Sequence, residues 1–351
     1  MTSGHALKLD YAPSLDAVRD EWDRLAQAGA GVFATWEWAT AWWSHFGHGS
    51  EPLLARCQAA GRTLALLPMY ARPRHSVRVV RLVGHGPADE LGPLCALEDR
   101  GPTADAIKLL LDEVRADVFL GEQLRAEEHW RERLGASVRG SEPSPKLRLD
   151  GRGWEEFLAN RSKNFRGQVR RRERALERLG LRYRVCDESD RIEHDLDRLF
   201  ALHRAQWGGR DSNFTRLEAF HRDFAMSAFA RGWLRLWFLE VNGSDVAAWY
   251  GLRFEGVDLY YQAGRDPAWD RFAVGFVLLA HSLRESIADG VLEYRFGRGG
   301  EEYKSRFTDD DSRVETVVLP RRLKGHVALA AVDAARRRTG TRRLIRSALR
   351  T

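Results

Sequence analysis

Apolar and polar positions follow two different periods along the second half of the chain. In four stretches, apolar side chains recur every three or four residues, which is the spacing of one helix face. Between these stretches lie apolar runs, three of them separated by the hairpin-type turns Asn242-Gly243 and Glu255-Gly256. The pattern predicts helices over 162–179, 191–207, 216–230 and 275–287, and strands over 181–185, 233–241, 245–254, 257–263, 291–296 and 313–319.

The first half mixes the same two patterns. Pro13-Ser14 opens a helix that ends near Gly29, and Thr35 caps a short, Trp-rich helix. Strands are predicted over 53–58, 63–70, 77–83 and 117–120, and helices over 103–115 and 126–134. Pro68 favours a sheet edge for its strand, since proline donates no ladder hydrogen bond. Both halves are therefore predicted to be α/β (α+β), with mixed, largely antiparallel sheets flanked by helices.

The length of 351 residues exceeds one ordinary domain and suits two. The segment 141–145 (Ser-Glu-Pro-Ser-Pro) reads as a linker because two prolines break regular structure there. The predicted organisation is a first module over 1–140, this linker, a second module over 146–320 and a basic tail over 321–351.

Composition narrows the class of protein. Hydrophobic residues make up 44% and charged residues 30%, so each half can bury a core. No stretch has the ~20 apolar residues of a membrane helix, and Met1–Asp10 lacks the apolar centre of a signal peptide, so a cytoplasmic location is expected. The three cysteines are far apart in sequence, which argues against a disulfide framework or a zinc site, and no other spacing suggests a metal.

The net charge of +6 is concentrated in two places. Residues 321–351 carry +9 and residues 161–184 carry +8, so the rest of the chain has a net charge of −11. Two interpretations are open for each basic stretch: a surface for phosphates, nucleic acid or anionic membranes, or a solvated helix face.

The connection after the third strand of the second half is a candidate phosphate site. There a strand passes through residues 265–275 into a helix, and backbone N–H groups at such a junction can face a diphosphate. Gly275 permits close approach of the backbone and Arg271 supplies charge. The predicted donor-binding residues are Gln262, Arg271, Phe272, Ala273, Val274 and Gly275. An ordinary strand-to-helix connection is the alternative.

Five blocks in the second module carry a resemblance to a known family. They are Leu199–Trp207, Val246–Gly251, Tyr260–Pro267, Val274–Leu279 and Phe296–Phe307. In this order they resemble the CelD-type branch of the GNAT superfamily, which is related to the FemAB-like transferases. The aromatic segment 33–46 and the loop around Asp89 extend the resemblance into the first module.

The resemblance implies two tandem GNAT-like modules, an N-acyltransferase activity and acyl-CoA (acetyl-CoA) as co-substrate, with no metal. One feature departs from the best-known members of the superfamily: of their glycine-rich diphosphate loop only Gly275 remains, with Ala273 two residues before it. FemAB-like relatives use aminoacyl-tRNA as donor, so both donors stay open.

With the resemblance in place, Tyr303 and Lys304 are the leading catalytic candidates. The tyrosine would protonate a leaving thiolate and the lysine would stabilise an oxyanion or anchor a phosphate. A packing tyrosine beside a surface lysine is the alternative. His203, on the apolar stripe of its helix, is either a general base or a hydrogen-bonded core histidine.

The remaining candidates concern the acceptor. Tyr261 is a catalytic candidate or a cross-strand packing residue. Asp89 either orients an acceptor amine across the module interface or caps a turn. Trp207 and Tyr260 complete the predicted acceptor site. The Trp-rich segment 36–43 either stacks on a sugar or belongs to the core.

Three functions follow. The first is transfer of an acyl group from acyl-CoA to an amine by direct attack, the acceptor being an amino sugar, an amino acid or a cell-envelope precursor. The second is a FemAB-like transferase using charged tRNA, which the two basic stretches favour. The third is a non-catalytic accessory protein of polysaccharide biosynthesis. The oligomeric state stays open.

Overall fold

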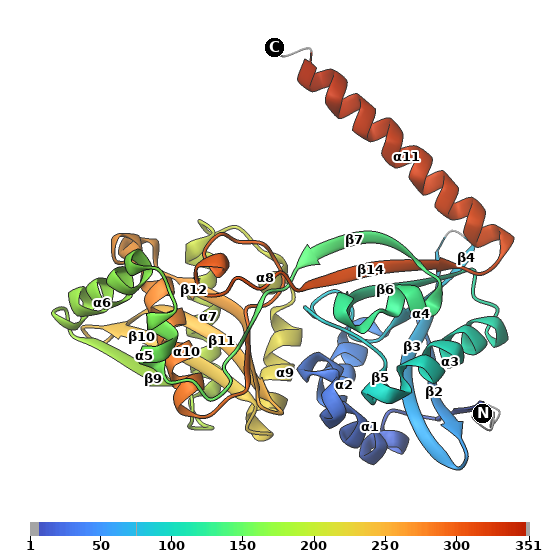
Figure 1. The fold of residues 1–351 in the computed structure, drawn as a ribbon, viewed down its shortest axis with the longest axis horizontal. Coiled ribbons are helices and arrows are strands. Elements are labelled where there is room, and N and C mark those ends of the chain that lie inside the picture. Colours follow the sequence, from blue (N-terminus) through green and yellow to red (C-terminus); the bar gives the residue numbers. More distant parts are fainter. Residues whose placement is uncertain (1–6, 75, 349–351) are drawn as a thin grey trace.

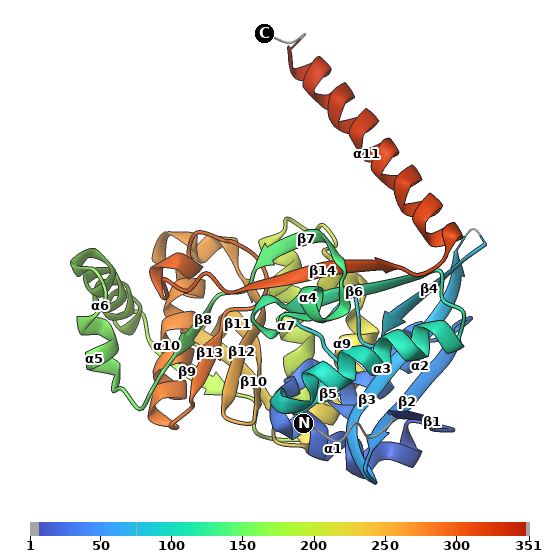
Figure 2. The ribbon, with the colours of Figure 1, turned by 45° about the vertical axis from the view of Figure 1, so that its right-hand side comes forward.

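The computed structural model describes residues 7–74 and 76–348, and it consists of two lobes that lie side by side (Figures 1 and 2). Each lobe is built around one mixed, largely antiparallel sheet with helices packed against it. The predicted fold class is therefore confirmed.

The first sheet has the strand order β1-β2-β3-β4-β6-β14-β7, and β5 pairs with β3 beside this path. An antiparallel meander leads into β4, and the chain then passes through helix α3 to β6, which runs parallel to β4. The strands are β1 (Lys8–Tyr11), β2 (Glu51–Ala59), β3 (Arg62–Arg74), β4 (Val77–Leu82), β5 (Leu94–Cys95), β6 (Val118–Arg125), β7 (Ser137–Pro143) and β14 (Arg313–Pro320).

The second sheet repeats this succession, with the order β8-β13-β12-β11-β10-β9. Its meander ends in β12, and helix α10 leads from there to β13, which is parallel to β12. The strands are β8 (Lys146–Arg148), β9 (Leu181–Val185), β10 (Leu234–Val241), β11 (Ser244–Phe254), β12 (Val257–Arg265) and β13 (Glu293–Arg295).

The helices cover both sheets, except for α11, which projects from the body (Figure 1). They are α1 (Arg19–Leu25), α2 (Trp36–Phe46), α3 (Arg100–Glu113), α4 (Trp130–Leu134), α5 (Trp154–Ala159), α6 (Lys163–Glu177), α7 (Ile192–Gln206), α8 (Asn213–Arg216), α9 (Glu218–Ala230), α10 (Val274–Ala288) and α11 (Leu323–Ala348). Helix α11 takes up most of the predicted basic tail, and residues 349–351 lie outside the described residues. Among the residues that the structure describes, no helix has the length and apolarity needed to span a bilayer.

The chain crosses between the two lobes twice, first at the predicted linker and again before β14. β7 includes residues 141–143, which the sequence assigns to the linker, and β8 then enters the second sheet. β14 follows the second module in sequence but lies between β6 and β7 of the first sheet. There it buries Val314, Val317 and Val318. The segment 313–320 therefore completes the first sheet, although the sequence assigns it to the second module.

Pro68 lies inside the first sheet, and the expectation of an edge strand is wrong. β3 pairs with β2 along one side. On its other side, residues 69–74 pair with β4 and residues 65–66 with β5. Pro68 falls in the gap between these two pairings, where a missing N–H leaves no ladder bond unmade.

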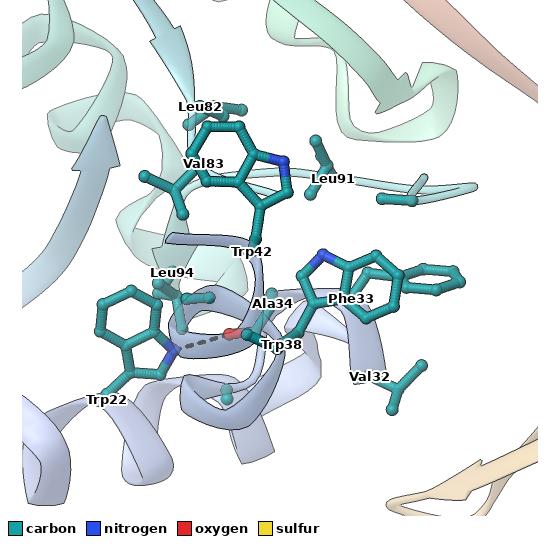
Figure 3. Close-up of a cluster of buried hydrophobic side chains, with 14 of the residues drawn as sticks. Trp22, Val32, Phe33, Ala34, Trp38, Trp42, Leu82, Val83, Leu91 and Leu94 are labelled. Atoms are coloured by element: carbon teal, nitrogen blue, oxygen red, sulfur yellow. Dashed lines mark hydrogen bonds between the residues drawn. The ribbon is translucent and has the colours of Figure 1, made fainter. Parts of the chain in front are cut away.

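The Trp-rich segment forms the core where the lobes meet. Trp38 and Trp42 are buried, and Figure 3 shows them in a cluster of buried side chains that also includes Phe33 and Trp22. The indole N–H of Trp22 donates to the Ala34 carbonyl oxygen at 2.7 Å. The Trp38 ring contacts two phenylalanines of α9 at 4.9 and 4.7 Å between centroids. Of the two roles considered for the segment, the core role holds for Trp38 and Trp42.

Gly264 lets α7 pack directly on β12. A Cβ atom at this position would lie 2.3 Å from the His203 nitrogen and 2.7 Å from the Leu202 carbonyl carbon. Because both are backbone atoms, neither can move away, so we expect Gly264→Ala to lower the free energy of unfolding by about 2–3 kcal/mol or more. Urea unfolding checks this. The control is Gly167→Ala in α6, where a Cβ meets nothing within 4 Å, and it should be neutral or stabilising. Equal stability of the two variants would contradict the prediction.

Candidate functional site

A cavity of about 830 Å³ opens at the junction of the two lobes. β12 pairs with β13 only over Val257–Leu259, and beyond that point the cavity follows β12 as far as Arg265. The first turn of α10, the end of α7, the loop before α8 and the turn after β13 complete its wall. Its lining includes the predicted residues Asp89, His203, Trp207, Tyr260, Tyr261, Gln262, Ala273, Gly275, Tyr303 and Lys304.

The first turn of α10, where Gly275 and Phe276 line this cavity, leaves backbone donors without a partner. Ala273 has a left-handed conformation (φ 53°), and its carbonyl oxygen accepts the first helical bond, from the Val277 nitrogen. Among the described residues, the N–H groups of Val274, Gly275 and Phe276 have no partner. Unsatisfied N–H groups at a helix start attract anions.

Not every predicted donor-loop residue reaches the cavity. Gln262, Ala273 and Gly275 line it, whereas the side chains of Arg271, Phe272 and Val274 do not. The Arg271 guanidinium lies over the Phe272 ring, 4.6 Å from its centroid, and Val274 is fully buried in the core. The geometry therefore favours the backbone of this turn over the Arg271 charge as the anion-binding element.

Tyr303 lines the cavity and carries a hydroxyl group. No described residue forms a hydrogen bond with this hydroxyl, and the ring lies 6.5 Å from that of Tyr260. Burial, and after it the neighbouring Tyr260, Glu301 and Asp89, raise the pKa of Tyr303 far above its ordinary value. The hydroxyl thus keeps its proton at neutral pH and is available as a donor.

Lys304 has a different position from the one expected. Its Nζ atom is buried and donates to the carbonyl oxygens of Gly297, Arg298 and Gly299 at 2.9–3.3 Å. It also pairs with Glu301 at 2.8 Å. Since its donors are used within the protein, Lys304 fixes the glycine-rich turn that precedes Tyr303 instead of offering a charge to a ligand.

Asp89 reaches the cavity from the first module. Its Oδ2 atom accepts a hydrogen bond from the Arg298 backbone nitrogen at 3.1 Å, and its Oδ1 atom lies 3.8 Å from the Arg298 Nε atom. Burial raises the pKa of Asp89 to about 6, although Arg298 and Lys304 partly offset the effect. Asp89 therefore places a carboxylate in a mainly buried part of the cavity wall, and this carboxylate can accept further hydrogen bonds.

His203 is held by two hydrogen bonds of fixed direction. Its Nδ1–H donates to the Ala263 carbonyl oxygen at 2.7 Å, so Nε2 accepts from the Ser212 hydroxyl at 2.8 Å. Burial lowers the pKa of His203, and the bond to Ala263 acts in the opposite direction. Ser212 also caps α8 by accepting from the Thr215 nitrogen at 3.2 Å. The neutral histidine thus makes Ser212 a pure acceptor toward the cavity.

Ser212 was not predicted from the sequence, although the Ser-x-x-Thr spacing of its capping box was available as a signal. Arg298, the partner of Asp89, lies in the block Phe296–Phe307 and was not among the predicted site residues. Of the two roles open for Tyr261, packing is evident: its ring lies in the aromatic core and its hydroxyl donates to the Pro87 carbonyl oxygen at 2.7 Å. Trp207, 47% exposed, lines the cavity near α7.

Residues 163–305 match the family described as "Acetyltransferase (GNAT) domain", the CelD-like family. The second module is a GNAT acetyltransferase domain. The match covers the meander, α10 and the turn carrying Tyr303 and Lys304. The match does not extend to the first module. No curated protein matches the chain significantly in sequence.

Solved structures share the fold of the GNAT module together with that of the first module. The crystal structure of FemX has a TM-score of 0.63 at 8% identity, and the alignment covers 88% of this chain and 96% of FemX. A C-terminal domain of a putative lysylphosphatidylglycerol synthetase from Agrobacterium fabrum has a TM-score of 0.60 at 12% identity, covering 92% and 96% of the two chains. L-PGS from Bacillus licheniformis has a TM-score of 0.55 at 12% identity, covering 89% and 94%. At these identities the likeness extends to the fold alone.

Proposed function

We propose that this protein is an N-acyltransferase that moves an acyl group from an acyl-CoA thioester to an amine bound between the two modules. One observation carries the proposal: a single cavity brings together the free amides of α10, the Tyr303 hydroxyl and the Asp89 carboxylate. These groups suit a diphosphate, a leaving thiolate and an ammonium group, respectively.

The donor would lie along β12 with its diphosphate at the N-terminus of α10. The amides of Val274, Gly275 and Phe276 supply donors there, and Gly275 has no side chain that could keep the phosphate away. Because β12 and β13 separate beyond Leu259, the pantetheine arm fits beside the strand toward Tyr303.

The reaction is direct attack of the amine nitrogen on the thioester carbonyl carbon. The C–N bond forms, the C–S bond breaks, and Tyr303 donates a proton to the thiolate, while the amine loses two protons overall if it enters as an ammonium group. Asp89 first pairs with that ammonium and then accepts one of its protons. The second amine proton returns to Tyr303 after the thiolate has left. Amino sugars, amino acids and cell-envelope precursors all present such an amine.

Covalent catalysis by cysteine receives no support from the thiols. All three are buried, and burial raises the pKa of Cys57 and Cys95 to about 11 and that of Cys186 to about 12. None of them lines the cavity. A thiolate nucleophile is thus disfavoured, in keeping with direct transfer.

Gly275→Ala tests the donor site. A Cβ at this position lies 3.6 Å from the Arg265 Cδ atom, so the fold should accept it, yet the methyl group adds bulk beside the amides. We expect the affinity for coenzyme A to fall about tenfold, measured by calorimetry, with an unchanged melting temperature. Arg271→Ala, which alters a side chain outside the cavity, should change the affinity much less. Wild-type protein that binds no coenzyme A would refute the proposed donor.

A FemAB-like transfer from charged tRNA is the second candidate. Helix α6 supports it, because several of its arginines are exposed and a basic helix suits an RNA backbone. Activity that requires aminoacyl-tRNA and falls steeply with salt would favour this candidate over acyl-CoA.

A further inference from the structure

Two arginines from different elements converge on one aromatic ring beside the proposed donor site. Arg306, in the short helix η7 (Lys304–Arg306), places its Cζ atom 4.8 Å from the centroid of Phe276. Arg172, in α6, places its Cζ atom 5.7 Å from the same centroid. Phe276 belongs to the first turn of α10, which carries the free amides, and it lines the cavity. Both guanidinium groups therefore lie beside this turn, at the ring of Phe276 and outside the cavity lining itself.

Within the described part of the chain, neither arginine has an acidic partner. Arg306 donates to the neutral amide oxygen of Gln168, and Arg172 forms no ion pair. Burial, followed by the charges of Arg306 and Arg171, lowers the pKa of Arg172. Other arginines nearby are neutralised: Arg161 pairs with Asp309, Arg170 with Glu155 and Arg284 with Glu173.

Two partly buried like charges held over one ring repel each other and lose hydration. The cation–π contacts with Phe276 offset this cost only in part. An anion between the guanidinium groups would offset the rest, and a phosphate suits the planar donors of arginine. In the proposed function the α10 amides bind the diphosphate, so the two arginines are available to bind another phosphate.

We propose that Arg172 and Arg306 form a second anion subsite, which binds a phosphate of the acyl carrier other than its diphosphate. In coenzyme A this is the 3′-phosphate of the adenosine. The inference rests on the proposed function, because it assumes that the diphosphate lies at α10. The subsite would make the enzyme specific for carriers with three phosphates and would disfavour carriers that end at a single phosphate.

The experiment compares coenzyme A with 3′-dephospho-coenzyme A by calorimetry, in the wild type and in Arg172→Gln/Arg306→Gln. The wild type should prefer coenzyme A by about tenfold or more, the value expected for charge-assisted hydrogen bonds. In the double variant that preference should disappear, while the affinity for 3′-dephospho-coenzyme A stays the same. The matched control is Arg174→Gln/Arg178→Gln, which removes two exposed charges from the same helix region and should keep the preference.

Each other outcome has a distinct meaning. If the double variant loses the same affinity for both nucleotides, the arginines would act on the diphosphate, and the proposed subsite would be overturned. The subsite would also be overturned if the preference for coenzyme A survives in the double variant or is absent in the wild type. In either case the donor site at α10 would stand as long as Gly275→Ala weakens the binding of both nucleotides. Failure of the wild type to bind either nucleotide would instead refute the acyl-CoA proposal itself. Circular dichroism of each variant confirms that it is folded.

Discussion

Replacing Tyr303 with phenylalanine is expected to lower kcat by about 10²- to 10³-fold while leaving the dissociation constant for coenzyme A unchanged. Tyr303 lines the cavity and its hydroxyl has no partner among the described residues, so removal of the hydroxyl breaks no hydrogen bond of the fold. Its raised pKa keeps it protonated until the thiolate leaves, which is the condition for a general acid. An interaction made only as the C–S bond breaks affects turnover and not donor binding.

Steady-state kinetics with an acyl-CoA and an amine acceptor, together with calorimetry, measure the two effects separately. Tyr260→Phe is the matched control, because it removes another tyrosine hydroxyl from the lining of the same cavity. Tyr260 stacks on Trp249 at 5.7 Å, so its main contribution is its ring, which phenylalanine retains. Tyr303→Phe with the turnover of the wild type would remove the general-acid role.

Much of the fold could be predicted because local signals agree with it. The turn Asn242-Gly243 and the alternation around it predict the β10–β11 hairpin, and a glycine ends most of the predicted helices. The placement of β14 in the first sheet could not be predicted. Residues 313–320 show an ordinary strand pattern, and only tertiary burial of Val317 and Val318 decides which sheet they join.

The candidate site was also predictable only in part. Gln262, Gly275 and Tyr303 lie far apart in sequence but line one cavity, as the order of elements implies. Which hydrogen-bond donors are already used depends on the three-dimensional arrangement, so the sequence could not reveal that Lys304 is bound to three carbonyl groups. Nor could any spacing bring Arg172 and Arg306 to the same ring.

Asp89→Asn is expected to make the protein more stable and nearly inactive. Burial raises the pKa of Asp89 from 3.8 to about 6, so folding at neutral pH requires a buried, ionised carboxylate. The shift corresponds to about 3 kcal/mol of stability, which is fully present below pH 3.8 and is lost as the pH rises through about 6. Asparagine keeps the acceptor for the Arg298 nitrogen without the charge. The gain in unfolding free energy should therefore increase between pH 4 and pH 6.5 and then level off.

Activity should change in the opposite direction, because an amide neither pairs with an ammonium group nor accepts its proton. We expect kcat/KM for the amine to fall by about 100-fold with coenzyme A binding unaffected. Glu90→Gln, at the next position, is the control. Burial acts to raise the pKa of Glu90, but Arg295 and Arg125 outweigh it and lower the pKa, so this variant should lose stability, more at pH 8 than at pH 4. Urea unfolding between pH 4 and pH 8 measures the change in unfolding free energy of both variants. A stabilised Asp89→Asn variant with full activity would show that the buried charge of Asp89 has no role in binding the acceptor. Equal destabilisation of the Asp89→Asn and Glu90→Gln variants would show that ionisation of the Asp89 carboxylate costs the fold little stability.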